Sequence, residues 1–167
     1  MANPEHLAIL KQGVETSNRW QGDLWKFNVD LSGGDLGNMD LRAACLYRAN
    51  LQRANFHHAN LSGANLLQAY LNGADLRGVD LSGANLFSTD LTGASISGNL
   101  SSAILINADL RGATIVNANL YATDFSNALL NGVLLRNADF TNALFHWTMF
   151  GSVDLSEATA LEAAKHR

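Results

Sequence analysis

The sequence Ala59-Asn60-Leu61-Ser62-Gly63-Ala64-Asn65-Leu66-Leu67-Gln68 contains the pattern that decides the fold. It consists of two five-residue units, each with a small residue, then Asp or Asn, then a large apolar residue and two further positions. We call the large apolar residue the centre, the residue before it the Asp/Asn position, and the two after it the outward and corner positions. Centres recur at every fifth residue from Leu31 to Ile96 and again from Leu100 to Leu155, and all 26 are Leu, Ile or Phe.

A five-residue period excludes the two common regular structures, because an α-helix repeats every 3.6 residues and a strand every two. The small position is Ala in 16 units, and the Asp/Asn position is Asp in ten and Asn in seven. The corner position is Gly in nine units and Asn in six, and these residues adopt positive φ most easily. We therefore expect each unit to end in a type II-like turn, with centres and small residues buried and the other positions facing water.

The units between Val29 and Leu155 resemble the A(D/N)LXX motif of the pentapeptide-repeat family. Members of that family form a right-handed quadrilateral β-helix, and the resemblance implies this handedness and the square cross-section. The predicted fold is thus an all-β solenoid of about 6.5 coils, four units to a coil, with a short α-helix at each end. Coils that stack at about 4.8 Å would give a rod roughly 31 Å long. Phe125 and Phe145 are 20 residues apart and should stack inside it.

The N-terminal segment, residues 1–28, is predicted to be a capping helix followed by an aromatic plug. Residues 3 to about 19 favour a helix, with Asn3 as N-cap and a proline in the first turn. Trp20, Trp25 and Phe27 follow it. The exposed end of a stacked coil invites aggregation unless it is covered. A separate helix that binds a partner is the alternative interpretation.

The C-terminal segment, residues 156–167, is predicted to be a second capping helix after the repeat domain of residues 29–155. Asp154 and Glu157 have the spacing of a capping box, and Lys165, His166 and Arg167 suit the C-terminus of a helix.

The phase of the repeat changes once. Ile96 and Leu100 are four residues apart, so Gly98 must serve two units. Keeping the old phase would bury Ser101 and Arg111, which is unfavourable. We expect one side to be a residue short near residues 97–102, either as a deletion absorbed at a Gly/Ser corner or as a functional notch.

Composition places the chain among packed proteins rather than disordered ones, with 47% apolar residues, 16% charged residues and one Pro in 167 residues. The net charge of −4 is too small to indicate nucleic acid or a membrane as a partner. The single cysteine, Cys45, excludes an intrachain disulfide. No stretch has the apolar length of a signal peptide or a membrane span. We predict a soluble, cytoplasmic protein.

Stacking every 20 residues, or 19 across the phase change, arranges the outward positions in columns. On the fourth side of the coil, counted from the unit of Leu31, the column is apolar in four consecutive coils: Tyr47, Leu67, Phe87 and Ile106. Contiguous exposed apolar residues usually mark a contact. We predict that this apolar stripe binds a protein partner or forms a homodimer, unless the N-terminal helix lies along that side and covers it.

A second apolar group lies near the C-terminus, where apolar residues take the Asp/Asn position and a tryptophan is close by. We call it the C-terminal patch: Leu129, Leu134, Leu144, Trp147 and Met149. Two interpretations remain open, cover by the closing helix and a dimer contact.

Catalytic and metal chemistry finds little support. His57 and His58 form an adjacent pair whose neighbouring columns supply no ligand set, so a solvated pair is favoured over a metal site. Nothing is placed to activate Cys45, which favours an inert thiol. Phosphate-binding and dinucleotide motifs are absent from the sequence, and the carboxylates are spaced along ladders rather than converging. We predict no enzyme activity, no cofactor, no metal and no small-molecule substrate.

The predicted function is a non-enzymatic rigid scaffold for protein–protein interaction. The family resemblance also implies an alternative, since gyrase-inhibiting members imitate duplex DNA and bind this type II topoisomerase. DNA carries about one negative charge per 1.7 Å, so a ~31 Å mimic needs about 18. The repeats carry ten Asp offset by six Arg, with no continuous acidic side. The charge density therefore argues against DNA mimicry.

Overall fold

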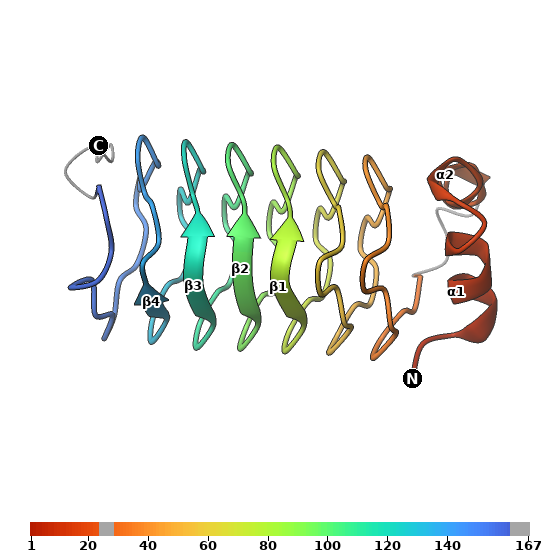
Figure 1. Cartoon of the computed structure of the whole chain (residues 1–167), viewed down its shortest axis with the longest axis horizontal. Helices are drawn as coiled ribbons and strands as arrows, with labels where there is room; N and C mark the ends of the chain where they lie inside the picture. Colours follow the sequence, from red (N-terminus) through yellow and green to blue (C-terminus); the bar gives the residue numbers. More distant parts are fainter. Residues whose placement is uncertain (24–28, 161–167) are drawn as a thin grey trace.

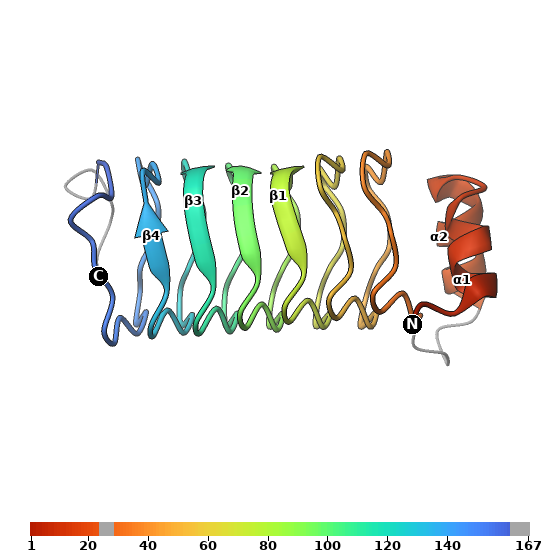
Figure 2. The same ribbon diagram turned by 60° about the horizontal axis from the view of Figure 1, so that its bottom comes forward.

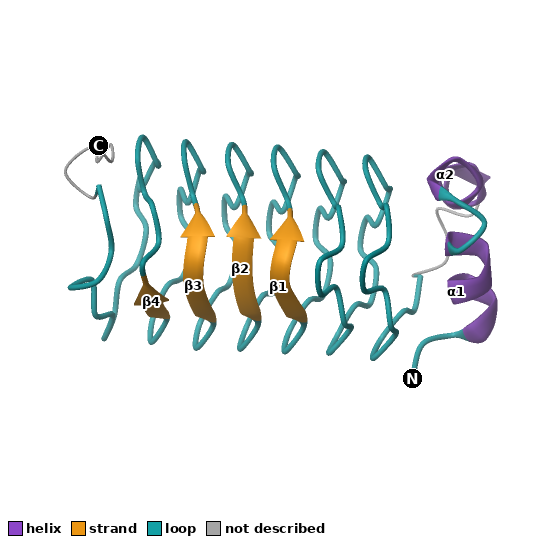
Figure 3. Ribbon diagram, viewed as in Figure 1, coloured by secondary structure: helices purple, strands orange, loops and turns teal. Residues whose placement is uncertain are grey.

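The computed structural model describes residues 1–23 and 29–160, which form a row of stacked coils with two helices at its N-terminal end (Figure 1). The elements are α1 (Pro4–Leu10), α2 (Val14–Asp23), β1 (Asp75–Asp80), β2 (Ser95–Asn99), β3 (Thr114–Asn119) and β4 (Leu134–Arg136). The four strands form one parallel sheet in chain order. The other described coils consist of turns and isolated bridges and are drawn as loop in Figure 3.

Four units make one coil. The parallel bridges join residues 20 apart, or 19 apart across the phase change, beginning with Asp30 to Asn50, Asp35 to Asn55, Asp40 to Asn60 and Cys45 to Asn65. These four ladders define the first, second, third and fourth sides of the solenoid. The prediction of an all-β solenoid built from the five-residue units is confirmed.

The interior holds the centres and the small residues. Every centre from Leu31 to Phe145 is buried. Two small positions are Thr89 and Thr123, whose buried hydroxyls donate to the carbonyls of Leu66 and Leu100 at 2.9 and 2.8 Å. These polar groups are therefore satisfied within the core.

Phenylalanine fills the core near the C-terminus. Phe125 stacks on Phe145 with ring centroids 5.4 Å apart and an interplanar angle of 16°. Phe140 and Phe150 contact the Phe145 ring at 5.4 and 5.2 Å. The predicted vertical stacking of Phe125 and Phe145 is confirmed.

The Asp/Asn position has a backbone role. In all 17 units with Asp or Asn there, the side-chain Oδ1 accepts the backbone N–H of the outward residue two positions later. Such an Asx turn fixes the start of the bend. The residue after the outward one then has positive φ, from +51° at Asn137 to +105° at Gly98, in every unit from Gly33 to Ser152. The prediction that the corner residue takes positive φ is confirmed.

The phase change shortens the second side. β1 and β2 pair 20 residues apart at Asp75 and Ser95 but 19 apart at Val79 and Gly98. Gly98 takes both the corner and the small position, and a Cβ there would lie 2.3 Å from the Val79 carbonyl oxygen. Ser97 Oγ accepts the N–H of Gly78 at 2.9 Å. The expected one-residue shortage is therefore present, and glycine is required at its turning point.

The N-terminal helices lie across the end of the row, beyond the first coil (Figures 1 and 2). Asn3 is the N-cap of α1, and its Oδ1 accepts the N–H groups of Glu5 and His6. The single helix predicted for residues 3–19 is wrong, because the chain turns after Leu10 and resumes as α2. The cause is Gly13, whose φ of +113° is not helical.

Contacts join α1 and α2 to the first coil. Asn3 N–H donates to the Asp30 carbonyl at 3.0 Å, and Asp30 N–H donates to His6 Nδ1 at 2.9 Å. Asn18 of α2 bonds the backbone of the fourth side, accepting from Cys45 N–H at 2.6 Å. Leu10 is buried in the common core. Of the predicted aromatic plug, Trp25, Phe27 and the side chain of Trp20 lie outside the described residues.

The predicted C-terminal helix does not form over residues 156–160. Asp154 accepts the N–H of Ser156 in one more Asx turn, and Thr159 pairs with Asp139 in the third-side ladder. The apparent capping box is thus a further repeat unit, whose Asp serves the turn. The rest of that prediction lies outside the described residues. Within the described chain, neither helix has the length and apolar character to cross a membrane.

Candidate interaction surface

The apolar stripe runs along the fourth side. Backbone bonds fix its residues in successive coils, because Arg48 N–H donates to the Leu67 carbonyl, Gln68 N–H to Phe87 and Ser88 N–H to Ile106. Tyr47 is 40% exposed, and Leu67, Phe87 and Ile106 are half-buried. The four side chains therefore form a continuous column on the surface, spaced by the coil repeat.

A groove of about 260 Å³ follows the corner beside this stripe. It is lined by Arg48, Gln68, Ala69, Tyr70, Ser88 and Asp90. Arg48 and Gln68 occupy the corner positions that follow Tyr47 and Leu67 in the chain, so the stripe and the groove are adjacent. The Arg48 guanidinium lies 5.8 Å from the centre of the Tyr47 ring, a cation–π contact.

The residues of the C-terminal patch do not lie on one face. Leu129 pairs with Met149 on the first side, Leu134 belongs to the second, and Leu144 to the fourth. Trp147 is at a corner of the fourth side and is 81% exposed, and Met149 is 54% exposed. The patch is thus a band around the last described coils. Its division over three sides follows from counting in steps of 20.

Three of the six arginines in the repeats pair with an aspartate of their own unit. Arg42, Arg77 and Arg111 each form an ion pair with the Asp two residues earlier, with a closest N–O distance of 2.6 Å. The hydrogen bond from the guanidinium is the main cause that lowers the pKa of Asp75 and Asp109 below the usual 3.8. This pairing reduces the acidic character of the surface.

The remaining residues considered for metal binding or nucleophilic chemistry are His57, His58 and Cys45. The His57 and His58 rings contact one another at 4.1 Å, but no group of three or more His, Cys, Asp or Glu side chains gathers at a metal-binding distance within residues 1–23 and 29–160. Cys45 is a half-buried free thiol, and its backbone N–H is held by α2.

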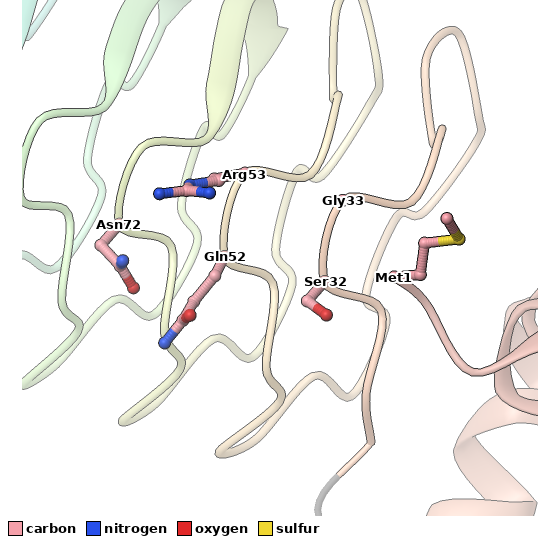
Figure 4. Close-up of a pocket in the computed structure, with 6 residues that line it drawn as sticks. All are labelled: Met1, Ser32, Gly33, Gln52, Arg53 and Asn72. Atoms are coloured by element: carbon pink, nitrogen blue, oxygen red, sulfur yellow. The ribbon is translucent and has the colours of Figure 1, made fainter.

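Two further hollows lie on other sides. One, of about 360 Å³, is lined by Met1, Ser32, Gly33, Gln52, Arg53 and Asn72, and Figure 4 shows Gln52 and Arg53 reaching toward the coil of Asn72. The other, of about 280 Å³, lies at the phase change, with Ile96, Ser97 and Val116 in its lining. Both differ from the groove beside the stripe in having no exposed apolar column next to them.

Sequence reasoning missed the groove residues Arg48, Tyr70 and Asp90. Tyr70 takes an Asp/Asn position that is otherwise polar on the first side up to residue 109, and this departure was the available signal. Arg48 was counted only as a charge. The cation–π contact and the corner geometry that group these residues required coordinates.

A parallel solenoid with a five-residue unit, an Ala-lined core and Asx turns defines a repeat protein of a recognisable class. The family model for pentapeptide repeats matches the chain in eight copies, over residues 27–63, 54–93, 99–132 and 118–157. The chain therefore belongs to the pentapeptide repeat family. No curated protein matches the sequence significantly.

Solved structures resemble the chain over most of its length. One is a trypsin-treated form of QnrB1, a plasmid-mediated fluoroquinolone resistance protein, with a TM-score of 0.64 at 23% identity over 84% of this chain and 78% of that one. Another is HetL from the cyanobacterium Nostoc sp. strain PCC 7120, involved in heterocyst differentiation regulation (TM-score 0.44, 26% identity, 81% and 80% covered). A third is a pentapeptide repeat protein from the thylakoid lumen of Arabidopsis thaliana (TM-score 0.43, 33% identity, 68% and 66% covered).

Proposed function

We propose that this protein is a non-enzymatic, rigid scaffold for protein–protein interaction, and that the apolar stripe is its docking surface. The observation that supports the proposal is the column of Tyr47, Leu67, Phe87 and Ile106, which the backbone ladder holds at the surface of consecutive coils. Apolar residues scattered singly need no explanation, but a contiguous group on a rigid surface favours a contact. The occupant is a protein partner or a second copy of the chain.

The same proposal includes the finer features of the fold that the family relationship implies. We infer a right-handed winding and about 6.5 coils between Leu31 and Leu155, four units to a coil. We also infer that residues 1–28 act as the N-terminal cap, because α1 and α2 bond the first coil through Asn3, His6 and Asn18.

DNA mimicry has weaker support. A mimic needs a row of unpaired negative charges, whereas Asp40, Asp75 and Asp109 are each neutralised by an Arg in the same unit. The likeness to QnrB1 at 23% identity concerns the fold. Inhibition of gyrase supercoiling by the purified protein would restore this alternative.

The test of the scaffold function is comparative capture. The immobilised protein is exposed to an extract of its host beside variants Leu67→Ala and Phe87→Ala, with circular dichroism to show that each is folded. Tyr121→Ala is the matched control, because Tyr121 is an exposed outward residue on the third side. We expect a bound protein, or a second copy of the chain, to be lost from both stripe variants and retained by the control. If the stripe variants still retained the bound protein, the apolar stripe would not be the docking surface.

A further inference from the structure

The spacing of the apolar stripe fits one kind of partner. Its residues rise with the coils, at about 0, 4.8, 9.6 and 14.4 Å along the axis. An α-helix with apolar residues at i, i+3, i+7 and i+10 presents them at about 0, 4.5, 10.5 and 15 Å. An extended peptide places side chains of one face about 6.8 Å apart and loses this register after one step.

Charge along the adjoining groove gives such a helix a direction. Arg48 lies at one end of the groove and Asp90 at the other. Asn50, in the unit after Arg48, pairs with Tyr70, and Tyr70 pairs with Asp90, so the two charges are two coils apart. Two coils are about 9.6 Å, and residues i and i+7 of a helix are about 10.5 Å apart. A helix can therefore place an acidic residue against Arg48 and a basic one against Asp90, seven residues later.

Both charged groups are available for this role. Arg48 is exposed and forms none of the ion pairs found among residues 1–23 and 29–160; its guanidinium lies near the Tyr47 ring. Asp90 uses Oδ1 for its turn with Thr92, which leaves Oδ2 for an incoming cation; the charge of Arg111, whose guanidinium is hydrogen-bonded to Asp109, also reaches Asp90. Gln68 and Ser88 lie between the two charges and offer uncharged polar contacts.

We propose that the occupant of the apolar stripe is an amphipathic α-helix of a partner protein, with apolar residues at i, i+3, i+7 and i+10 and an acidic and a basic residue seven apart on the flank over the groove. This inference rests on the proposed scaffold function and names its partner class. The apolar seam supplies the contact area, and the charge pair fixes the direction of the helix. The acidic residue lies nearer the N-terminal end of the solenoid.

The probe is a pair of fluorescent helical peptides of 14 residues. The first has leucine at its third, sixth, tenth and thirteenth positions, glutamate at the second and lysine at the ninth, so that the charges lie about 1.5 Å before and 9 Å beyond the first leucine along the helix axis. The second has the two charges exchanged. Turning the second peptide end to end would move its charges to the opposite flank, away from the corner, so it cannot recover the pairing.

Binding is measured by fluorescence anisotropy with the full-length protein. We expect the first peptide to bind at least about tenfold more tightly than the second, as expected for discrimination by opposite charges. Leu67→Glu should abolish binding of both. Arg48→Glu should remove most of the preference, whereas Arg53→Glu should leave it unchanged, because Arg53 is the corner residue of the following unit, on the first side, and lies outside the groove. Asp90→Asn keeps the Oδ1 acceptor and should reduce the preference as well.

Equal binding of the two peptides, or no binding of either, would overturn the helical partner. If capture from the host extract still depended on Leu67, the proposed scaffold function would stand, but its partner would not be a helix of this kind. A dimer that Leu67→Glu dissociates, seen by light scattering, would instead make a second copy the occupant and overturn the proposal.

Discussion

Phe145 lies at the centre of the aromatic core in the last described coils, where it contacts the rings of Phe125, Phe140 and Phe150. We expect Phe145→Ala to lower the free energy of unfolding by about 3–5 kcal/mol, as for a large core cavity. Urea denaturation measures this change. The neighbouring outward residue offers a control, His146→Ala, which should change stability by less than about 0.5 kcal/mol. A loss below about 1 kcal/mol for Phe145→Ala would contradict the inward assignment of the centres.

The Asp109–Arg111 pair predicts a dependence of stability on pH. The guanidinium lowers the pKa of Asp109 below 3.8, so the folded pKa lies under the unfolded one. The pair therefore stabilises the fold above pH 3.8, and this contribution disappears as the pH falls through the folded pKa. Because the side chains are partly exposed to solvent, we expect less than about 1 kcal/mol at neutral pH.

A double-mutant cycle with Asp109→Asn and Arg111→Gln, followed by urea denaturation, measures this coupling. The coupling should be present at neutral pH and decrease as the pH falls below the ordinary pKa of Asp and through the lowered pKa of Asp109. A coupling that persists in acid would show that hydrogen bonding independent of the carboxylate charge holds the pair.

Among the elements, the shortened second side gives the sharpest test. Inserting one Ala between Gly98 and Asn99 restores a five-residue unit and supplies the missing small residue. We expect the variant to fold with an unfolding free energy no lower than that of the natural chain. The same insertion after Gly83, where the unit is already complete, should lower it by about 2 kcal/mol or more, because polar side chains must then enter the core. Equal effects at the two sites would contradict the register.

The elements also show what the sequence could predict. The repeat and its phase change could be predicted from the sequence, because only one register buries every Leu, Ile and Phe centre. The backbone hydrogen bonds of Leu100 agree with that register. The structures of the two end segments were predicted less well, because each depends on the conformation of a single residue rather than on a repeated pattern. Gly13 ends the first helix with one positive φ, and Asp154 serves an Asx turn although its spacing also suits a helix cap.

Only part of the candidate site could be predicted from the sequence. The column of the apolar stripe follows from counting in steps of 20, which is fixed by the ladder. The groove beside it depends on how the long side chains of Arg48 and Tyr70 lie, and no spacing rule supplies that. The Arg–Asp ion pairs join an outward residue to the Asp two residues before it. The sequence shows this spacing, but only the coordinates show that the two side chains are in contact.

For the whole molecule, the N-terminal end should decide solubility. Removal of residues 1–23 uncovers the first coil, including the Asp30 N–H that His6 binds and the apolar contact of Leu10. Exposed strand edges pair with other chains. We expect the truncated protein to form larger assemblies that grow with concentration, measured by size-exclusion chromatography with light scattering. A truncated protein that stays as small as the full chain over the same concentrations would show that the helices are not needed as a cover.

The Asx turns and backbone ladder have a consequence for how such a protein changes through evolution. The bonds that join one coil to the next come from main-chain atoms, and the bends come from Asp or Asn Oδ1 and a backbone N–H, so the side chains at outward positions contribute little to either. Substitutions at outward positions are therefore close to neutral for folding. A lineage can acquire a new binding specificity on one side of the rod while the inherited architecture stays intact.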